Sequence, residues 1–178
     1  MLFVWSQIAT IIFEKKGLIM KRIIIHWTGG TYVPNEKEKE DYHFIVDGLG
    51  TVHKGNYTPE DNLNCYDDKY AKHTGGGNTG SIGIAMACMF GYKNPKNMGQ
   101  YPMTNIQFEA CMKKVAELCR QYNIAITPDT VLTHYEFGLK HPETSSAGKP
   151  DIGFLPPYPE VKYSDVGYFI RNKVRWYM

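Results

Sequence analysis

The sequence has few cysteines, and their spacing does not pair them. Its 178 residues include four, at positions 65, 88, 111 and 119. Zinc ribbons and thiol redox sites use CxxC pairs, and small disulfide scaffolds need a denser set of cysteines. The spacing therefore excludes these classes of protein. It predicts mostly buried free thiols, with a single disulfide as the lesser alternative.

Blocks of one charge and apolar runs of membrane length are also missing. Twenty Lys and Arg against 18 Asp and Glu give a formal net charge of +2, and no basic cluster marks a nucleic-acid groove. Residues 1–13 are mostly apolar, but this run is too short to cross a bilayer. It also lacks the basic region and the cleavage site of a signal peptide. We expect no nucleic-acid partner and no stable membrane association, and we expect a monomer.

The composition indicates one folded domain. Hydrophobic residues make up 43% of the chain, which is enough for a core and too much for a disordered chain. We expect the domain to span residues 20–178, because Met20 immediately precedes a strand-like segment. Residues 1–19 would then be an extension, with Met20 as the true start of the protein. The alternative is that residues 1–13 form a strand, a helix or a membrane-surface anchor.

Hydrophobic patterning predicts both strands and helices. Alternating or fully apolar segments indicate strands, and apolar residues at i, i+3 and i+4 indicate helices. Thr104 and Gln107 form a capping-box pattern at the start of the clearest helix. The predicted strands are 23–25, 42–46, 51–54, 80–90 and 129–137, and the predicted helices are 104–123 and 164–176. This order predicts an α/β fold, a single domain with a central mixed β-sheet flanked by helices.

Two of the predicted strands end in a histidine. His26 follows three isoleucines, and His134 follows a short apolar segment. If these strands are neighbours in the sheet, both imidazoles open onto the same edge and supply half of a zinc site. The third ligand would come from a nearby loop, where Glu136, His141 and Asp151 are the candidates. The alternative for each histidine is a hydrogen-bonded residue of the core.

Four segments along the chain resemble the motifs of one enzyme family. In order they read IIIHWTGG, YHFIVDGLGTVHKG, KHTGGGNTGSIGI, and LTHYEF followed by GKPDIGF, and together they span residues 22 to 154. They resemble the zinc-dependent N-acetylmuramoyl-L-alanine amidases of type two, which include phage lysozyme-type amidases and peptidoglycan recognition proteins. The resemblance implies a zinc ion (Zn2+) at the edge of the sheet in a surface groove. It also implies peptidoglycan as the substrate, cut between N-acetylmuramic acid and L-alanine.

The resemblance assigns a set of zinc ligands. The family uses its first histidine, its late histidine and a residue two positions after a lysine, which here are His26, His134 and Asp151. The loop from residue 135 to residue 148 is longer than in the compact phage members. His141 in that loop therefore remains the alternative third ligand.

The resemblance also implies roles for residues around the zinc. Lys149 would stabilise the oxyanion of the tetrahedral intermediate. Tyr42 would orient water or hydrogen-bond that intermediate, and its alternative role is packing at the start of a strand. His73 at the rim of the groove and Asn78 would contact the substrate. Some family members have an acidic general base where this chain has Ala85, so the general base is not assigned.

Together these features predict a zinc-dependent peptidoglycan amidase, made in the cytoplasm and acting on the cell wall. A phage endolysin and a bacterial cell-wall hydrolase both fit this prediction. One alternative is a recognition module of the same fold that binds peptidoglycan without cutting it. Another is a zinc hydrolase of unrelated small amides. The assignment of all three ligands favours catalysis over binding alone.

Overall fold

The computed structural model describes residues 19–178 of the chain. The expectations for residues 1–18, namely an extension, a strand, a helix or a surface anchor, lie outside the described residues. Met20 is buried in the main hydrophobic core, so the packed structure includes the first residue of the expected domain. Within the described part of the chain, every helix is too short or too polar to serve as a membrane span.

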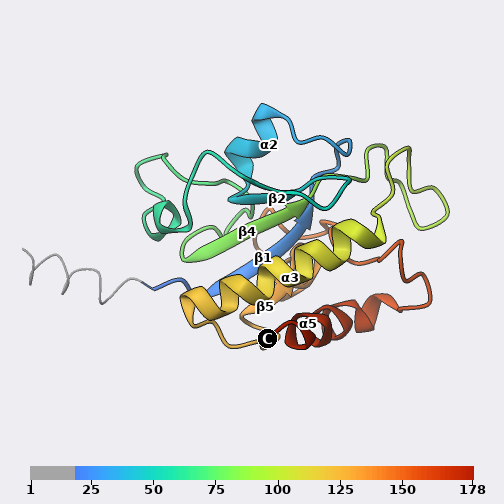
Figure 1. Ribbon diagram of the computed structural model, residues 1–178. Coiled ribbons are helices and arrows are strands. Elements are labelled where there is room, and N and C mark those ends of the chain that lie inside the picture. The colour runs from blue at the N-terminus through green and yellow to red at the C-terminus, as the bar shows by residue number, and fades with distance from the viewer. Residues whose placement is uncertain (1–18) are drawn as a thin grey trace, which may run out of the picture.

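A five-stranded mixed sheet forms the centre of the molecule (Figure 1). Its order across the sheet is β3-β2-β4-β1-β5. Strand β1 pairs in parallel with both β4 and β5, β2 pairs in parallel with β4, and β3 returns antiparallel to β2. The strands are β1 (Arg22–Trp27), β2 (Phe44–Val46), β3 (Val52–Lys54), β4 (Ser81–Met86) and β5 (Val131–Thr133). The predicted central mixed sheet is confirmed.

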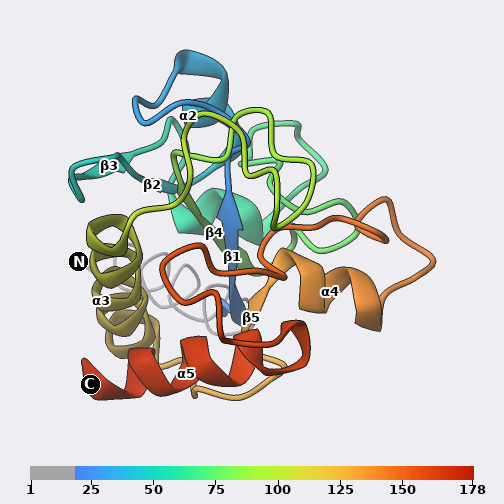
Figure 2. The ribbon, with the colours of Figure 1, turned by 90° about the vertical axis from the view of Figure 1, so that its right-hand side faces the viewer.

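Helices cover both faces of this sheet (Figure 2), and the packing differs between the two faces. The α-helices are α2 (Glu36–Asp41), α3 (Asn105–Tyr122), α4 (His134–Lys140) and α5 (Val166–Trp176), and two 3-10 helices are η1 (Pro59–Leu63) and η2 (Tyr163–Asp165). Side chains of β1 alternate between the faces because a strand has a period of two. Ile23 and Ile25 join α3 and α5 in the main core, whereas Ile24 packs with Leu132 and Phe137 on the side of α4.

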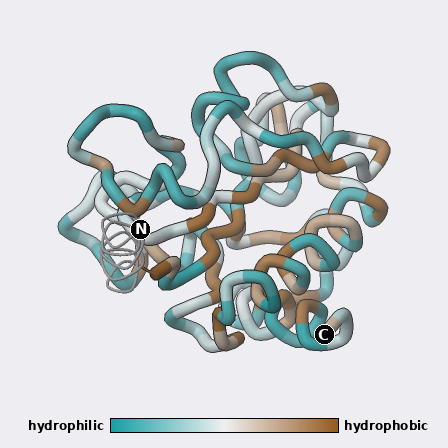
Figure 3. The backbone as a smooth tube through the Cα atoms, turned by 60° about the vertical axis from the view of Figure 1, so that its left-hand side comes forward, coloured by the Kyte–Doolittle hydropathy of each residue, from teal (hydrophilic) through white to brown (hydrophobic). Residues whose placement is uncertain are grey.

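The main core explains why α3 and α5 form where the sequence pattern places them. One face of α3 buries Phe108, Met112 and Val115, and α5 contributes Ile170 and Val174. Figure 3 shows the hydrophobic segments gathered in the interior, with hydrophilic loops around them. The predicted capping box of α3 is confirmed, because the Thr104 side chain accepts a hydrogen bond from the backbone N–H of Gln107. All four cysteines are free, and three of them are buried.

Several predicted strand boundaries were wrong, and the predicted strands 42–46 and 80–90 are shorter in the structure, at Phe44–Val46 and Ser81–Met86. Strand β1 continues through His26 and Trp27, because both remain paired with β4. The predicted strand 129–137 ends at Thr133, and α4 begins at His134. The physical reason is a capping box, in which the Thr133 hydroxyl accepts from Glu136 N–H at 3.1 Å and Glu136 Oε2 accepts from Thr133 N–H at 3.0 Å. Helix α2, which also begins with a capping box, was not predicted.

A partly buried ion pair holds this cap in place. The Arg171 guanidinium on α5 donates to both carboxylate oxygens of Glu136, at 3.0 and 3.1 Å, and to the carbonyl of Val131 at 3.1 Å. Glu136 thus caps α4, and at the same time it ties α4 to α5 and β5. Because His134 is the first residue of α4, the position of that histidine depends on this contact.

Replacing Arg171 by methionine should lower the free energy of unfolding by about 1–3 kcal/mol, because it leaves the partly buried Glu136 carboxylate without its charged partner. Urea denaturation followed by circular dichroism measures this change. Arg175→Met is the matched control, since Arg175 lies on the exposed side of the same helix, and it should cost about 0.5 kcal/mol or less. Equal losses from both variants would contradict the assigned role of the ion pair.

Candidate functional site

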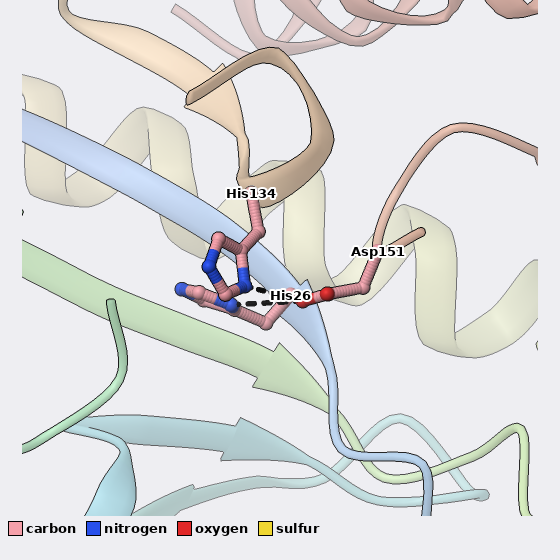
Figure 4. Close-up of side chains that lie close together, drawn as sticks. All are labelled: His26, His134 and Asp151. Carbon is pink, nitrogen blue, oxygen red and sulfur yellow. Dashed lines mark hydrogen bonds and ion pairs between the residues drawn. The ribbon is translucent and has the colours of Figure 1, made fainter. Parts of the chain in front are cut away.

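Three side chains from distant parts of the chain meet at the end of β1 (Figure 4). His26 comes from β1, His134 is the first residue of α4, and Asp151 comes from the loop after α4. Asp151 Oδ2 lies 3.0 Å from His26 Nδ1 and 3.1 Å from His134 Nδ1. The three residues expose only 0%, 6% and 7% of their surface, so water reaches them from one side at most.

The parallel pairing of β1 with β5 brings the two histidines together. In this register Ile25 lies opposite Thr133, and the next residue on each strand is a histidine. The two imidazole centroids are 4.7 Å apart. The loop that carries Asp151 is attached to the same place, because the N–H of Tyr135 donates to the Asp151 carbonyl at 2.6 Å. The fold therefore positions all three side chains through backbone contacts.

Burial controls the charge of this cluster. It lowers the pKa of His26 to about 4, against the opposing effect of the hydrogen bond with Asp151. Burial raises the pKa of the Asp151 carboxyl, but hydrogen bonds with His134 and His26 outweigh it and keep that pKa below its usual value. At neutral pH the cluster therefore has a neutral His26 and an ionised Asp151, the forms in which both side chains bind metals.

The donor set fits a zinc ion. Zinc binds imidazole nitrogen and carboxylate oxygen, and catalytic zinc sites combine three protein ligands with one open position. The three ligand atoms lie within 4.8 Å of one another, and His134 and Asp151 also line a surface groove. The site therefore offers three protein ligands and an open side toward the groove.

The other two candidates for the third ligand lie elsewhere. His141 is at the C-terminal end of α4, where its ring stacks on Phe137 and its Nδ1 is 3.3 Å from a Glu143 oxygen. Glu136 points into the ion pair with Arg171. Among the described residues, the three-residue cluster includes Asp151 and neither of these side chains.

The groove has a volume of about 480 Å³, and three further residues expected from the sequence line it, namely Tyr42, His73 and Lys149. Tyr42 lies on one wall with its ring 5.2 Å from that of His26, and burial, followed by the charge of Asp151, raises the pKa of its phenol. Lys149 is an exposed residue of the wall. A phenol and an ammonium group thus share the groove with the cluster.

His73 lies behind His26 and is largely buried. Its Nδ1 is 3.3 Å from His26 Nε2 and 2.8 Å from the Thr74 hydroxyl, and only 6% of the residue is exposed. Burial, followed by the nearby charges of His26 and His43, lowers the pKa of His73 well below its usual value. The structure therefore brings His73 against a cluster histidine and into the lining of the groove, and its expected contact with substrate stays a prediction.

Asn78 orders the glycine-rich loop from inside. Its side-chain oxygen accepts from the N–H of Thr74 at 2.8 Å, and its carbonyl accepts from the Asn62 side chain at 3.2 Å. His43 belongs to the same buried layer, where it binds Asn62 and the N–H of Gly83. Asn78 does not line the groove, and its expected contact with substrate stays a prediction.

Ser146 and Gly83 were missed at the level of sequence. The Ser146 hydroxyl is fully buried between His134 Nε2, at 2.9 Å, and the carbonyl of Gly75, at 2.8 Å. A Cβ at Gly83 would lie 2.3 Å from the His73 ring. The glycine inside the SIGI strand was a usable signal, because glycine in a strand often marks a close approach. The serine, in a polar loop, had no such signal.

The profile of the family described as N-acetylmuramoyl-L-alanine amidase matches residues 16–151, which is more than half of the chain. No curated protein matches the sequence.

Several solved structures are similar. The Ph2119 endolysin from the Thermus scotoductus MAT2119 bacteriophage Ph2119 has 16% identity over 88% of this chain and 85% of its own, with a TM-score of 0.51. The amidase LysC from Clostridium intestinale URNW has 17% identity, coverages of 74% and 80%, and a TM-score of 0.45. The Drosophila peptidoglycan recognition protein PGRP-SA has 15% identity, coverages of 84% and 78%, and a TM-score of 0.46. The first of these likenesses supports the fold.

Replacing Gly83 by alanine should lower the free energy of unfolding by about 1–3 kcal/mol, because the new methyl group displaces the His73 ring. Thermal and urea unfolding measure the change. In the Gly83→Ala/His73→Ala double variant the methyl group has room, so the two losses should not add. Strict additivity would show that the ring of His73 does not sit against β4.

Proposed function

Because this chain belongs to the N-acetylmuramoyl-L-alanine amidase family, we propose that it hydrolyses the amide between N-acetylmuramic acid and L-alanine of peptidoglycan with the help of zinc. The observation that carries the proposal is the convergence of His26, His134 and Asp151 at the groove. We further propose that residues 20–178 are the catalytic unit and that it acts on the cell wall, for a phage or for a bacterium.

The cluster would hold the metal, and the groove would hold the substrate. His26, His134 and Asp151 would hold the zinc ion, which would supply an activated water and a Lewis acid for the amide carbonyl. His26 contributes because burial keeps it neutral, and Asp151 contributes a negative charge that offsets part of the charge of the metal. The open side of the cluster faces the groove, where an extended glycan-peptide chain could lie.

Lys149 and Tyr42 are the groups we assign to the reacting amide. Attack on the carbonyl places negative charge on its oxygen, and a nearby cation stabilises that charge. Lys149 supplies an exposed ammonium group on the groove wall. Tyr42, on the wall beside His26, has a raised pKa and so keeps its proton, which it can donate in a hydrogen bond to the intermediate or to water.

Some family members have an acidic general base at the position of Ala85. Its absence from this chain limits the choice of proton carrier. Ala85 lies opposite His26 in the pairing of β1 with β4 and is fully buried. Among the described residues that line the groove, Asp151 is the only carboxylic acid, and it is assigned to the metal. Tyr42 and Lys149 are therefore the groups we propose to handle protons near the scissile bond.

Hydrolysis of purified peptidoglycan tests this function directly. The wild-type chain should carry about one zinc per chain and release new L-alanine amino termini. Asp151→Ala should lose both the metal and the release, because two ligands hold zinc poorly. His141→Ala is the matched control and should keep both.

Zinc content is measured by elemental analysis, and the new termini by amino-group labelling and mass spectrometry. Binding of peptidoglycan without cleavage would replace the proposal by a recognition module. Cleavage of small amides alone would replace it by a hydrolase of another substrate. Loss of zinc in His141→Ala, with full zinc in Asp151→Ala, would reverse the choice of ligand.

Replacing Lys149 by alanine should lower turnover by about 10²–10³-fold, the usual effect of removing one oxyanion donor. Its zinc content should stay unchanged, because a protonated ammonium group cannot be a metal ligand. Lys96→Ala is the control, since Lys96 is exposed and outside the groove. Turnover near that of wild type, or loss of zinc, would each contradict the oxyanion role.

A further inference from the structure

The hydrogen bonds around Ser146 determine which nitrogen of His134 carries the proton. The Ser146 hydroxyl lies 2.8 Å from the carbonyl of Gly75, which can only accept. The single hydroxyl proton must therefore point to Gly75. His134 Nε2, at 2.9 Å from the same oxygen, then meets a lone pair and has to donate. In this arrangement His134 is protonated at Nε2 and bears a lone pair at Nδ1.

A second chain of hydrogen bonds acts on His26 in the same way. His73 Nε2 faces the carbonyl of Ser81 at 3.4 Å, so this nitrogen carries the proton and His73 Nδ1 accepts. The Thr74 hydroxyl, 2.8 Å from His73 Nδ1, donates to it. His26 Nε2 lies 3.3 Å from both the Thr74 oxygen and His73 Nδ1. The lone pair of His73 Nδ1 already accepts from Thr74, but the Thr74 oxygen has lone pairs left to accept, so His26 is also protonated at Nε2.

These two series of hydrogen bonds leave three lone pairs directed at the centre of the cluster. Nδ1 of His26 and Nδ1 of His134 lie 3.0 and 3.1 Å from Asp151 Oδ2, which also accepts when the carboxyl is ionised. Acceptors that face one another at this distance repel unless a cation lies between them. That cation is either a proton, which makes the hydrogen bonds with Asp151 described above, or a metal ion that takes its place. The hydrogen bonds behind the histidines thus favour occupation of the cluster by a cation.

We propose that Ser146 and Thr74 are positioning residues that hold both histidines in the Nε2–H form and so present their Nδ1 atoms to the zinc. This inference rests on the proposed function, because it assumes that the cluster binds zinc. Partners of the second ring nitrogen typically change metal affinity by about 10–100-fold when they are removed. The glycine-rich loop at residues 74–80 would then be part of the support of the metal site.

Close packing of two loops makes this support rigid. A Cβ at Gly75 would come 1.8 Å from the Ser145 hydroxyl, and a Cβ at Gly76 would come 2.4 Å from the Thr144 methyl group. Glycine lets the backbone of this loop come so close to the side chains of Thr144 and Ser145. The segment that carries Ser146 lies inside the long connection between α4 and Asp151. This extra length therefore brings in the residue that orients His134.

Zinc affinity of Ser146→Ala, measured by competition with a chelator, tests the proposal. The variant should bind zinc about 10–100-fold more weakly than wild type. Ser164→Ala is the matched control, because Ser164 is exposed and bonds only Asp165, and its affinity should equal that of wild type. Thr74→Val should weaken binding, whereas Thr74→Ser keeps the hydroxyl and should restore most of the affinity.

A spectroscopic measurement separates orientation from general damage. In the 15N–1H imidazole spectrum of the zinc-loaded wild-type protein, both histidines should show a protonated Nε2. In Ser146→Ala, the Nε2 proton of His134 should lose its protection against exchange with water. Should Ser146→Ala fail to fold, the wild-type spectrum decides alone, and a protonated Nδ1 on His134 overturns the proposal. Unchanged zinc affinity in folded Ser146→Ala also overturns it. Absence of zinc binding by the wild-type chain would instead refute the proposed function itself.

Discussion

The parallel pairing of β1 with β5 is the constraint on which the rest of the site depends. It pairs Ile25 with Thr133, and the next residue of each segment is a histidine, His26 on β1 and His134 at the start of α4. The capping box at Thr133 then turns the chain into α4 directly after the pairing ends. A longer β5 would carry residue 134 along the strand direction, so the abrupt change from strand to helix is what points this imidazole toward Asp151.

The two faces of the sheet have different tasks. The face toward α3 and α5 is apolar and contains the main core. The other face has small residues on β4, Gly83 and Ala85, opposite Ile24 and His26, and this leaves room for a buried layer of His43, Asn62 and His73. Every buried side-chain nitrogen and oxygen among the described residues has a hydrogen-bond partner. Such a fully satisfied polar layer can be rigid, which a preorganised metal site requires.

The groove combines this rigid floor with exposed, charged side chains on its walls. His26, His134 and Asp151 are held by strands, a helix start and a backbone hydrogen bond, whereas Lys149 and Lys72 are exposed side chains on the groove walls. A rigid floor suits a metal, since ligand distances vary little. Exposed cations on the walls can stabilise an anionic or developing negative charge. This arrangement of buried metal ligands and exposed cations is consistent with an enzyme of the amidase family.

The sequence by itself determined the elements whose signals are local. The apolar runs predicted the strands, the capping box at Thr104 predicted the start of α3, and four ordered motifs indicated the amidase family, which the family profile confirmed. Tertiary structure decided what depends on how distant segments meet. It placed Asp151 at the cluster and His141 away from it. It also placed His73 against His26 and revealed Ser146 as the partner of His134. These contacts join residues 12 to 125 positions apart, and no periodicity or local propensity records which of several loop residues the folded chain will bring to a given strand.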